Sequence, residues 1–154
     1  MITTENEVKQ KLLQGINMVA DAVSPTLGPQ AKTAILQGNP PVIINDGVTI
    51  TKYVMHDDPY VQMGIQMVQN LASQAQDKSG DGTTTACILA RSLCNNIFSH
   101  YSNIENMRVF QDELSNIQEF VVTKIEEASQ SITEDDVFDV AFISSNNDTE
   151  IAGM

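Results

Sequence analysis

The chain has 154 residues, of which 42% are hydrophobic, and it carries 20 acidic against 8 basic side chains, a net charge of −12. This length is enough for one hydrophobic core, and no run of apolar residues is long enough to cross a bilayer. Because an acidic chain without a basic patch is poorly suited to binding phosphate backbones, we expect no nucleic-acid partner, no membrane partner and a cytoplasmic location.

The first expected element is a helix that ends near residue 23. Thr4 and Glu7 have the spacing of a capping box, in which each side chain binds the backbone of the other. Apolar residues then recur every three or four positions, at Val8, Leu12, Ile16, Val19 and Val23. Pro25 and the pair Gly28-Pro29 follow and end the pattern. The spacing predicts a helix with one buried stripe.

Two short runs of β-forming residues come next, at residues 33–36 and 42–44. The segment between them, Gly38-Asn39-Pro40-Pro41, is rich in turn residues, so the two runs predict a small hairpin. Asn45-Asp46-Gly47 follows, and we interpret it as a turn between two β-type runs.

Helical periodicity dominates the rest of the chain. A second helix is expected over about residues 61–76, with Met63, Met67, Leu71 and Ala75 facing inward. A third begins after Gly82 and carries Ile88, Leu89, Leu93 and Ile97. The clearest pattern is Met107, Phe110, Leu114, Ile117, Val121, Ile125 and Ala128. Methionine and aromatic stripes of this kind are typical of a core. The fold class predicted is mainly α with one small hairpin.

The two cysteines and the acidic residues add two further expectations. Cys87 and Cys94 lie about 10 Å apart along one helix, at 1.5 Å per residue, which is too far for a disulfide. Residues 101–154 carry twelve acids and two bases, against eight and six in residues 1–100. We favour a solvated face for these acidic C-terminal residues, although a ring-lining surface or a surface for basic partners also fits.

The most informative segment is Gly80-Asp81-Gly82-Thr83-Thr84-Thr85, which lies between two helical patterns. The glycines let the backbone turn tightly and approach a ligand. The threonines fall at the start of a helix, where unpaired N–H groups and the helix dipole favour an anion. Asp81 repels a phosphate, so a metal ion would have to stand between them. The segment predicts a metal–nucleotide site.

Three other interpretations of this segment are a phosphate loop, an EF-hand and a simple helix cap. The chain has no Gly-x-x-x-x-Gly-Lys-Ser/Thr phosphate loop. Asp77, Ser79 and Asp81 match the first ligand positions of an EF-hand, but Ile88 stands where a bidentate glutamate is required. A loop in which Thr83 simply caps the next helix is the alternative to phosphate binding, and this segment by itself leaves both open.

Further segments occur in a fixed order around this loop. They are Gly-Ile-Asn-Met-Val-Ala-Asp-Ala-Val at 15–23, Thr-Leu-Gly-Pro at 26–29, Asn-Asp-Gly-Val-Thr-Ile at 45–50, Met-Gly-Ile-Gln-Met-Val at 63–68 and Ile-Ser-Ser-Asn-Asn-Asp at 143–148. Together they resemble the amino-terminal part of a group I, GroEL-like chaperonin, one of the ATP-driven protein-folding rings. The resemblance covers about residues 11–93 and resumes at 143–148.

This resemblance implies a helical equatorial ATP-binding domain, in its amino-terminal half, over residues 1–129, and the start of an intermediate domain over 130–154, with no apical domain. It implies ATP or ADP, Mg²⁺ and K⁺ as cofactors. Asp81 would ligate Mg²⁺, Asp46 would be catalytic, and the carbonyl oxygens of Thr26 and Asn45 would hold K⁺. The nucleotide would contact Thr26, Leu27, Gly28, Pro29, Asn45, Gly47, Asp81, Gly82, Thr83, Thr84 and Thr85.

The chain also departs from the family pattern. Gln30 and Ala31 replace a lysine and a glycine, and Asn45 replaces a lysine, so we expect weaker nucleotide binding. A second catalytic aspartate of the family has no counterpart here. We therefore expect a fragment or truncated copy, bacterial or viral, of an ATP-dependent chaperonin subunit that hydrolyses ATP poorly. The alternative is a non-catalytic module that packs with chaperonin subunits without ATP turnover.

The resemblance also implies partners. They are other chaperonin subunits in a homo-oligomeric ring, and unfolded polypeptides and a co-chaperonin that would bind through domains absent from this chain. The expected location is the bacterial cytoplasm, or the host cytoplasm for a viral copy.

Overall fold

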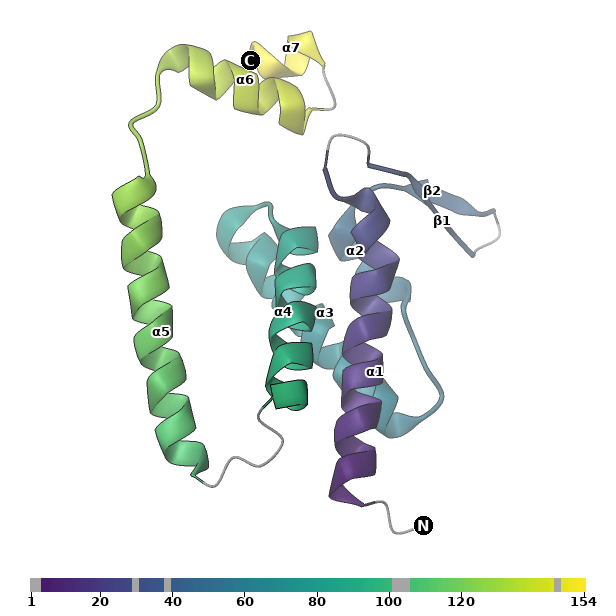
Figure 1. The fold of residues 1–154 in the computed structure, drawn as a ribbon. Coiled ribbons are helices and arrows are strands. Elements are labelled where there is room, and N and C mark those ends of the chain that lie inside the picture. The colour runs from purple at the N-terminus through teal and green to yellow at the C-terminus, as the bar shows by residue number, and fades with distance from the viewer. Residues whose placement is uncertain (1–3, 29–30, 38–39, 101–105, 146–147) are drawn as a thin grey trace. The chain divides into compact units, whose positions relative to one another are not determined.

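The computed structural model describes residues 4–28, 31–37, 40–100, 106–145 and 148–154. Within these ranges the fold is mainly helical with one hairpin, as the sequence predicted (Figure 1). The chain divides into two compact units, residues 1–103 and 104–154. The proposed division into equatorial and intermediate parts at residue 129 is a different, functional division and stays a prediction.

Helix α1 (Glu5–Val23) begins as predicted. The Thr4 hydroxyl accepts a hydrogen bond from the Glu7 backbone, and the Glu7 carboxylate accepts one from the Thr4 backbone, so the capping box is formed. The buried residues of α1 are Gly15, Ile16, Val19, Ala20 and Val23. A short 3-10 turn, η1 (Ser24–Thr26), ends the helix at the proline, as expected.

The hairpin is confirmed. Strands β1 (Ala34–Leu36) and β2 (Val42–Ile44) pair antiparallel, with Ile35 opposite Ile43. Its side chains at positions 35 and 43 are exposed on one face, whereas Leu36 and Ile44 pack against the core.

The chain after Asp46 is not β-type, so that interpretation was wrong. Residues Gly47–Tyr53 form helix α2, and the Asp46 carboxylate caps it by accepting from the backbone N–H groups of Val48 and Thr49. Val48, Ile50 and Thr51 are buried against the rest of the first unit. Helix capping and burial outweigh the β propensity of this short β-branched run.

Helices α3 (Pro59–Ser79) and α4 (Thr83–His100) pack with α1 around the core of the first unit. The core consists of Ile16, Val19, Val23, Ile50, Val61, Ile65, Val68, Ala72 and Cys87. Helices α1 and α3 approach very closely, since a Cβ on Gly64 would lie 2.1 Å from the Leu12 carbonyl oxygen and one on Gly15 would lie 2.1 Å from that of Val61.

The predicted inward faces of α3 and α4 were wrong in part. Met63 and Met67 are 50% and 55% exposed, and α3 instead buries Val61, Gly64, Ile65, Val68 and Ala72. This face turns inward because only glycine at position 64 allows the close approach of α1. On α4, Leu89 and Leu93 are likewise exposed, while Cys87 is buried.

Both cysteines are free thiols, as predicted from their spacing. Burial raises the pKa of the Cys87 thiol and that of the Cys94 thiol.

The second unit contains helices α5 (Met107–Ala128), α6 (Glu134–Ser144) and α7 (Thr149–Ala152). The long helix α5 is confirmed, but no residue on it is buried, so its apolar stripe is not the predicted core. The rings of Phe138 and Phe142 on α6 stack with their centroids 6.2 Å apart. The Asp148 carboxylate caps α7 by accepting from the backbone N–H groups of Glu150 and Ile151.

Candidate functional site

The loop between α3 and α4 has the backbone that its glycines predict. Gly80 and Gly82 have φ angles of +71° and +79°, in the left-handed region that favours glycine. Between them, the Asp81 carboxylate accepts a hydrogen bond from the Gly82 N–H, and Asp81 is exposed. Two left-handed glycines on either side of Asp81 thus turn the chain directly into α4.

Thr83 is the first residue of α4, so the interpretation that it caps the helix from outside was wrong. The Gly82 carbonyl accepts the first bond of the helix, from the Ala86 N–H. Thr83 is buried, Thr84 half-buried and Thr85 exposed, so the three hydroxyls lie at graded depth in the first turn. The N–H groups of a first turn and the helix dipole favour an anion at this end.

Three segments distant in sequence meet at Thr84. The hydroxyl oxygens of Thr26 and Thr84 lie 3.4 Å apart, with either able to donate. A Cβ on Gly47 would lie 2.5 Å from the Thr84 hydroxyl, so any larger residue at position 47 would displace the Thr84 side chain. The structure therefore brings together one residue from each of the turn after α1, the start of α2 and the start of α4.

Asp46 adjoins this point at the N-terminus of α2. Burial of its carboxyl raises its pKa, but hydrogen bonds from Thr49 and Val48, together with the positive charge of Lys52, outweigh that effect and lower the pKa below its ordinary value. The ionised carboxylate therefore caps α2 and carries a negative charge beside Gly47.

Leu27, Gly28 and Asn45 lie on the same loops, and no hydrogen bond between the described residues joins them to Thr84. Leu27 is exposed, and Gly28 has a φ angle of +85°. Asn45 is exposed just before Asp46. Pro29 lies outside the described residues.

The residues present fit a magnesium–nucleotide complex in the chemistry of their donors. In the described part of the chain, no group of three or more His, Cys, Asp or Glu side chains is placed to hold a metal ion. A Mg²⁺ ion that keeps several waters and is shared with phosphates needs only one or two protein carboxylates. Asp81, exposed next to a helix N-terminus, meets that requirement.

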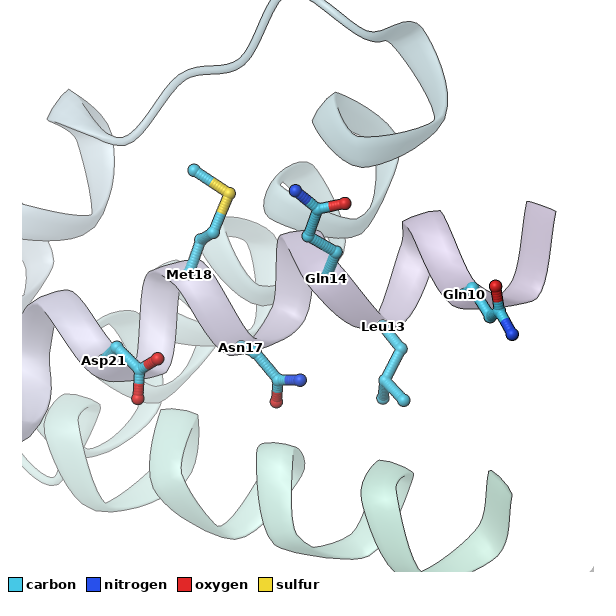
Figure 2. Close-up of a pocket in the computed structure, with 6 residues that line it drawn as sticks. All are labelled: Gln10, Leu13, Gln14, Asn17, Met18 and Asp21. Carbon is cyan, nitrogen blue, oxygen red and sulfur yellow. The ribbon is translucent and has the colours of Figure 1, made fainter. Parts of the chain in front are cut away.

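A pocket elsewhere in the first unit does not coincide with these loops. It lies along α1, and Gln10, Leu13, Gln14, Asn17, Met18 and Asp21 line it (Figure 2). Leu13, Asn17 and Asp21 extend toward α4, where Asn17 accepts from Asn95 and Asp21 pairs with Arg91. No predicted site residue lines this pocket, so it does not belong to the proposed nucleotide site.

Sequence reasoning missed one residue that bears on the site. Gln69, in α3, donates from its side-chain amide to two carbonyl oxygens at the C-terminal end of α2. No motif marks it, because its partners lie 15 and 18 residues away and on another helix.

Comparison with known proteins decides the family. The model of the TCP-1/cpn60 chaperonin family matches residues 19–152, which is most of the chain. The chain belongs to this family. The predicted resemblance to GroEL-like chaperonins is thereby confirmed.

Curated relatives of this chaperonin chain come from bacteria and from organelles. It is 36% identical to Chaperonin GroEL 1 of Prochlorococcus marinus, over 100% of this chain and 28% of that protein. It is 34% identical to the mitochondrial chaperonin homolog Hsp-60 of Caenorhabditis elegans, over 96% of this chain and 27% of that protein. The chain thus spans less than a third of the length of these relatives.

Solved chaperonin structures share the fold. The chaperonin gp146 from the bacteriophage EL 2 (Pseudomonas aeruginosa), in the presence of ATP-BeFx, superimposes with a TM-score of 0.79 at 24% identity, over 96% of this chain and 26% of that one. A group III chaperonin in the open state gives a TM-score of 0.77 at 23% identity, over 94% and 30%. Among the helices that the structure describes, none is long and apolar enough to cross a membrane.

Proposed function

We propose that this chain is the nucleotide-binding part of an ATP-dependent chaperonin subunit, which folds polypeptides within a ring complex. The observation that carries the proposal is the meeting of Thr26, Gly47 and Thr84 at the first turn of α4. These residues come from three of the motifs that carry the chaperonin resemblance, and members of the family form oligomeric rings. We propose other chaperonin subunits, unfolded polypeptides and a co-chaperonin as its partners.

In this proposal the first turn of α4 receives the phosphates through its N–H groups and through the hydroxyls of Thr83, Thr84 and Thr85. The turn at residues 26–29 lies against the nucleotide, and Asn45 and Gly47 lie at its phosphate end. The left-handed glycines of the loop keep side chains clear of the approach.

Two acidic residues have the remaining roles, metal binding and activation of water. Asp81 binds Mg²⁺, whose charge offsets that of the phosphates. Asp46 polarises the attacking water near the terminal phosphate, and its lowered pKa keeps it ionised for that role. The carbonyl oxygens of Thr26 and Asn45 provide ligands for K⁺.

The domain arrangement is part of the same proposal. Residues 1–129 form the amino-terminal half of an equatorial domain, and residues 130–154 begin an intermediate domain. Because no motif in the chain matches the second catalytic aspartate of the family, we expect the 154 residues to bind ATP rather than turn it over.

Isothermal titration calorimetry of the purified chain with Mg-ATP tests this proposal. Asp81→Ala should abolish magnesium-dependent binding. Asp77→Ala is the matched control, because it removes the same charge from an exposed position four residues earlier and should leave binding unchanged. Equal effects of the two substitutions would show that only net charge matters and would refute the assignment of Asp81.

The second candidate is an interaction module that packs with chaperonin subunits without ATP turnover. The exposed apolar side chains of the first unit favour it, namely Met63 and Met67 on α3 and Leu89 and Leu93 on α4. Exposed apolar groups of this size often mark surfaces that another chain covers. This candidate predicts no nucleotide binding to the unmodified chain, together with association into complexes on size-exclusion chromatography.

A further inference from the structure

The C-terminal end of α2 is held by a side chain from another helix. The amide nitrogen of Gln69, in α3, donates to the carbonyl oxygen of Thr51 at 2.7 Å and to that of Val54 at 3.1 Å. The last carbonyl groups of a helix lack the regular intrahelical donors and are often bonded by other groups. The Thr51 carbonyl also accepts from the backbone N–H of Val54, so Gln69 is its second donor. Gln69 therefore ties the end of α2 to α3 by two hydrogen bonds.

Helix α2 depends on contacts of this kind because it has only seven residues. Isolated helices of that length are not stable in water. Burial of Val48, Ile50 and Thr51 decides which face of α2 turns inward. Apolar burial is not directional, however, so it leaves the helix able to slide along its axis. The directional bonds from Gln69 fix its position along that axis.

A slide of α2 along its axis would change the contacts at its opposite end. Asp46 caps that end, and the Cα of Gly47 is so close to α4 that a Cβ would lie 2.5 Å from the Thr84 hydroxyl. A seven-residue helix is about 10 Å long, so Gln69 acts on this end across the whole helix. A displacement of about 1 Å is enough to change the rate or affinity of a positioned site.

We propose that Gln69 is a positioning residue, which sets Asp46 and Gly47 against the first turn of α4 and thereby controls the affinity of the site for nucleotide. This inference rests on the proposed function. Gln69 itself contacts only the C-terminal end of α2, so it acts through the helix and not on the ligand.

Substitutions at position 69 separate the donor from the size of the side chain. Gln69→Met removes both hydrogen bonds at nearly constant volume, whereas Gln69→Lys restores a donor that can reach the same carbonyl groups. The control is Lys11→Met, which breaks the ion pair between α1 and the N-cap residue Asp58 of α3 without touching α2.

The expected change in affinity corresponds to about half of the two hydrogen bonds that are lost. Gln69→Met should weaken Mg-ATP binding about 5- to 10-fold, the equivalent of about one net hydrogen bond. Gln69→Lys should recover binding to within about 2-fold, and Lys11→Met should leave it unchanged. A Lys11→Met loss as large as that of Gln69→Met would overturn the proposal, because it would point to general loosening of the fold.

A double-mutant cycle tests the route through Asp46. Asp46→Asn keeps a capping oxygen but removes the negative charge, so Gln69 no longer positions a charged group at the site. In that background the effect of Gln69→Met should shrink to less than about 2-fold, since coupled residues are not additive. The same loss in both backgrounds would show that Gln69 does not act through Asp46.

Hydrogen exchange keeps this inference distinct from the proposed function. If the unmodified chain does not bind Mg-ATP, the proposed function fails, and the exchange of the Val48 and Thr49 amides decides the role of Gln69. These amides should open about 10-fold more often in Gln69→Met than in Lys11→Met. Equal exchange rates in Gln69→Met and Lys11→Met would overturn the positioning role of Gln69. Gln69→Ser serves for the same comparison if Gln69→Met does not fold.

Discussion

The contact of α1 with α3 predicts that Gly64→Ala destabilises the protein. A Cβ at position 64 would lie 2.1 Å from the Leu12 carbonyl oxygen and 2.9 Å from its carbonyl carbon, whereas ordinary Cβ contacts begin at 3.4 Å. The helices would have to separate by about 1.3 Å (3.4 − 2.1), because the obstacle is backbone and cannot rotate away. A gap of about 1 Å already forfeits up to half of each dispersion contact across the interface.

The size of this effect is set by two opposing terms. Alanine is favoured over glycine inside a helix by about 1 kcal/mol, and overpacking a core costs about 1–3 kcal/mol, occasionally more. Because Ile16, Val19, Ile65 and Val68 lose contacts along the same interface, we expect the overpacking cost to reach the upper end of its range, about 3 kcal/mol, which leaves a net loss of about 2 kcal/mol.

Urea unfolding followed by far-UV circular dichroism measures this loss, since the chain has no tryptophan. Asn70→Ala is the matched control, an exposed alanine substitution on the same helix, and should leave stability equal or slightly raised. The reasoning is refuted if Gly64→Ala is as stable as the unmodified chain, because helix propensity alone predicts a gain.

Two further predictions concern acid stability and thiol reactivity. The hydrogen bond from Lys11 is the main reason why the pKa of Asp58 is lowered. The ionised carboxylate therefore stabilises the folded state above its unfolded pKa of about 3.9. That contribution disappears as the pH falls through the lower folded pKa. Urea midpoints measured at several pH values should therefore fall less steeply on acidification in Lys11→Met, and parallel curves would contradict this. With a thiol reagent, Cys94 should react before Cys87, whose side chain is fully buried. Mass spectrometry of the labelled peptides measures the order, and faster labelling of Cys87 would contradict this prediction.

Much of the fold was predictable because its signals are local. The capping box of Thr4 and Glu7, the end of α3 at Gly80 and the start of α4 after Gly82 depend on residues within four positions of each other. The hairpin pairs residues that are six to ten positions apart. The start of α2 was missed because the four β-branched residues at 48–51 follow Gly47, and their propensity concealed the Asp46 N-cap, which itself predicts a helix.

The inward faces could not be read reliably from the same patterns. On α3 the stripe of Met63 and Met67 and the stripe of Val61, Ile65 and Val68 both repeat with helical period. Periodicity identifies a helix but does not choose between two apolar faces. Close approach of α1 chooses the second, since that face carries the glycine.

By itself, the sequence determined helices α1, α3, α4 and α5, the hairpin, the glycine turn before α4 and the chaperonin motifs, because each depends on a regular local pattern or on motifs in a fixed order. Tertiary structure alone decided that Thr26, Gly47 and Thr84 meet, and that Gln69 holds the far end of α2. These contacts join residues 15 to 58 positions apart. No local propensity encodes them, because they form only once α1, α3 and α4 have packed around a shared core.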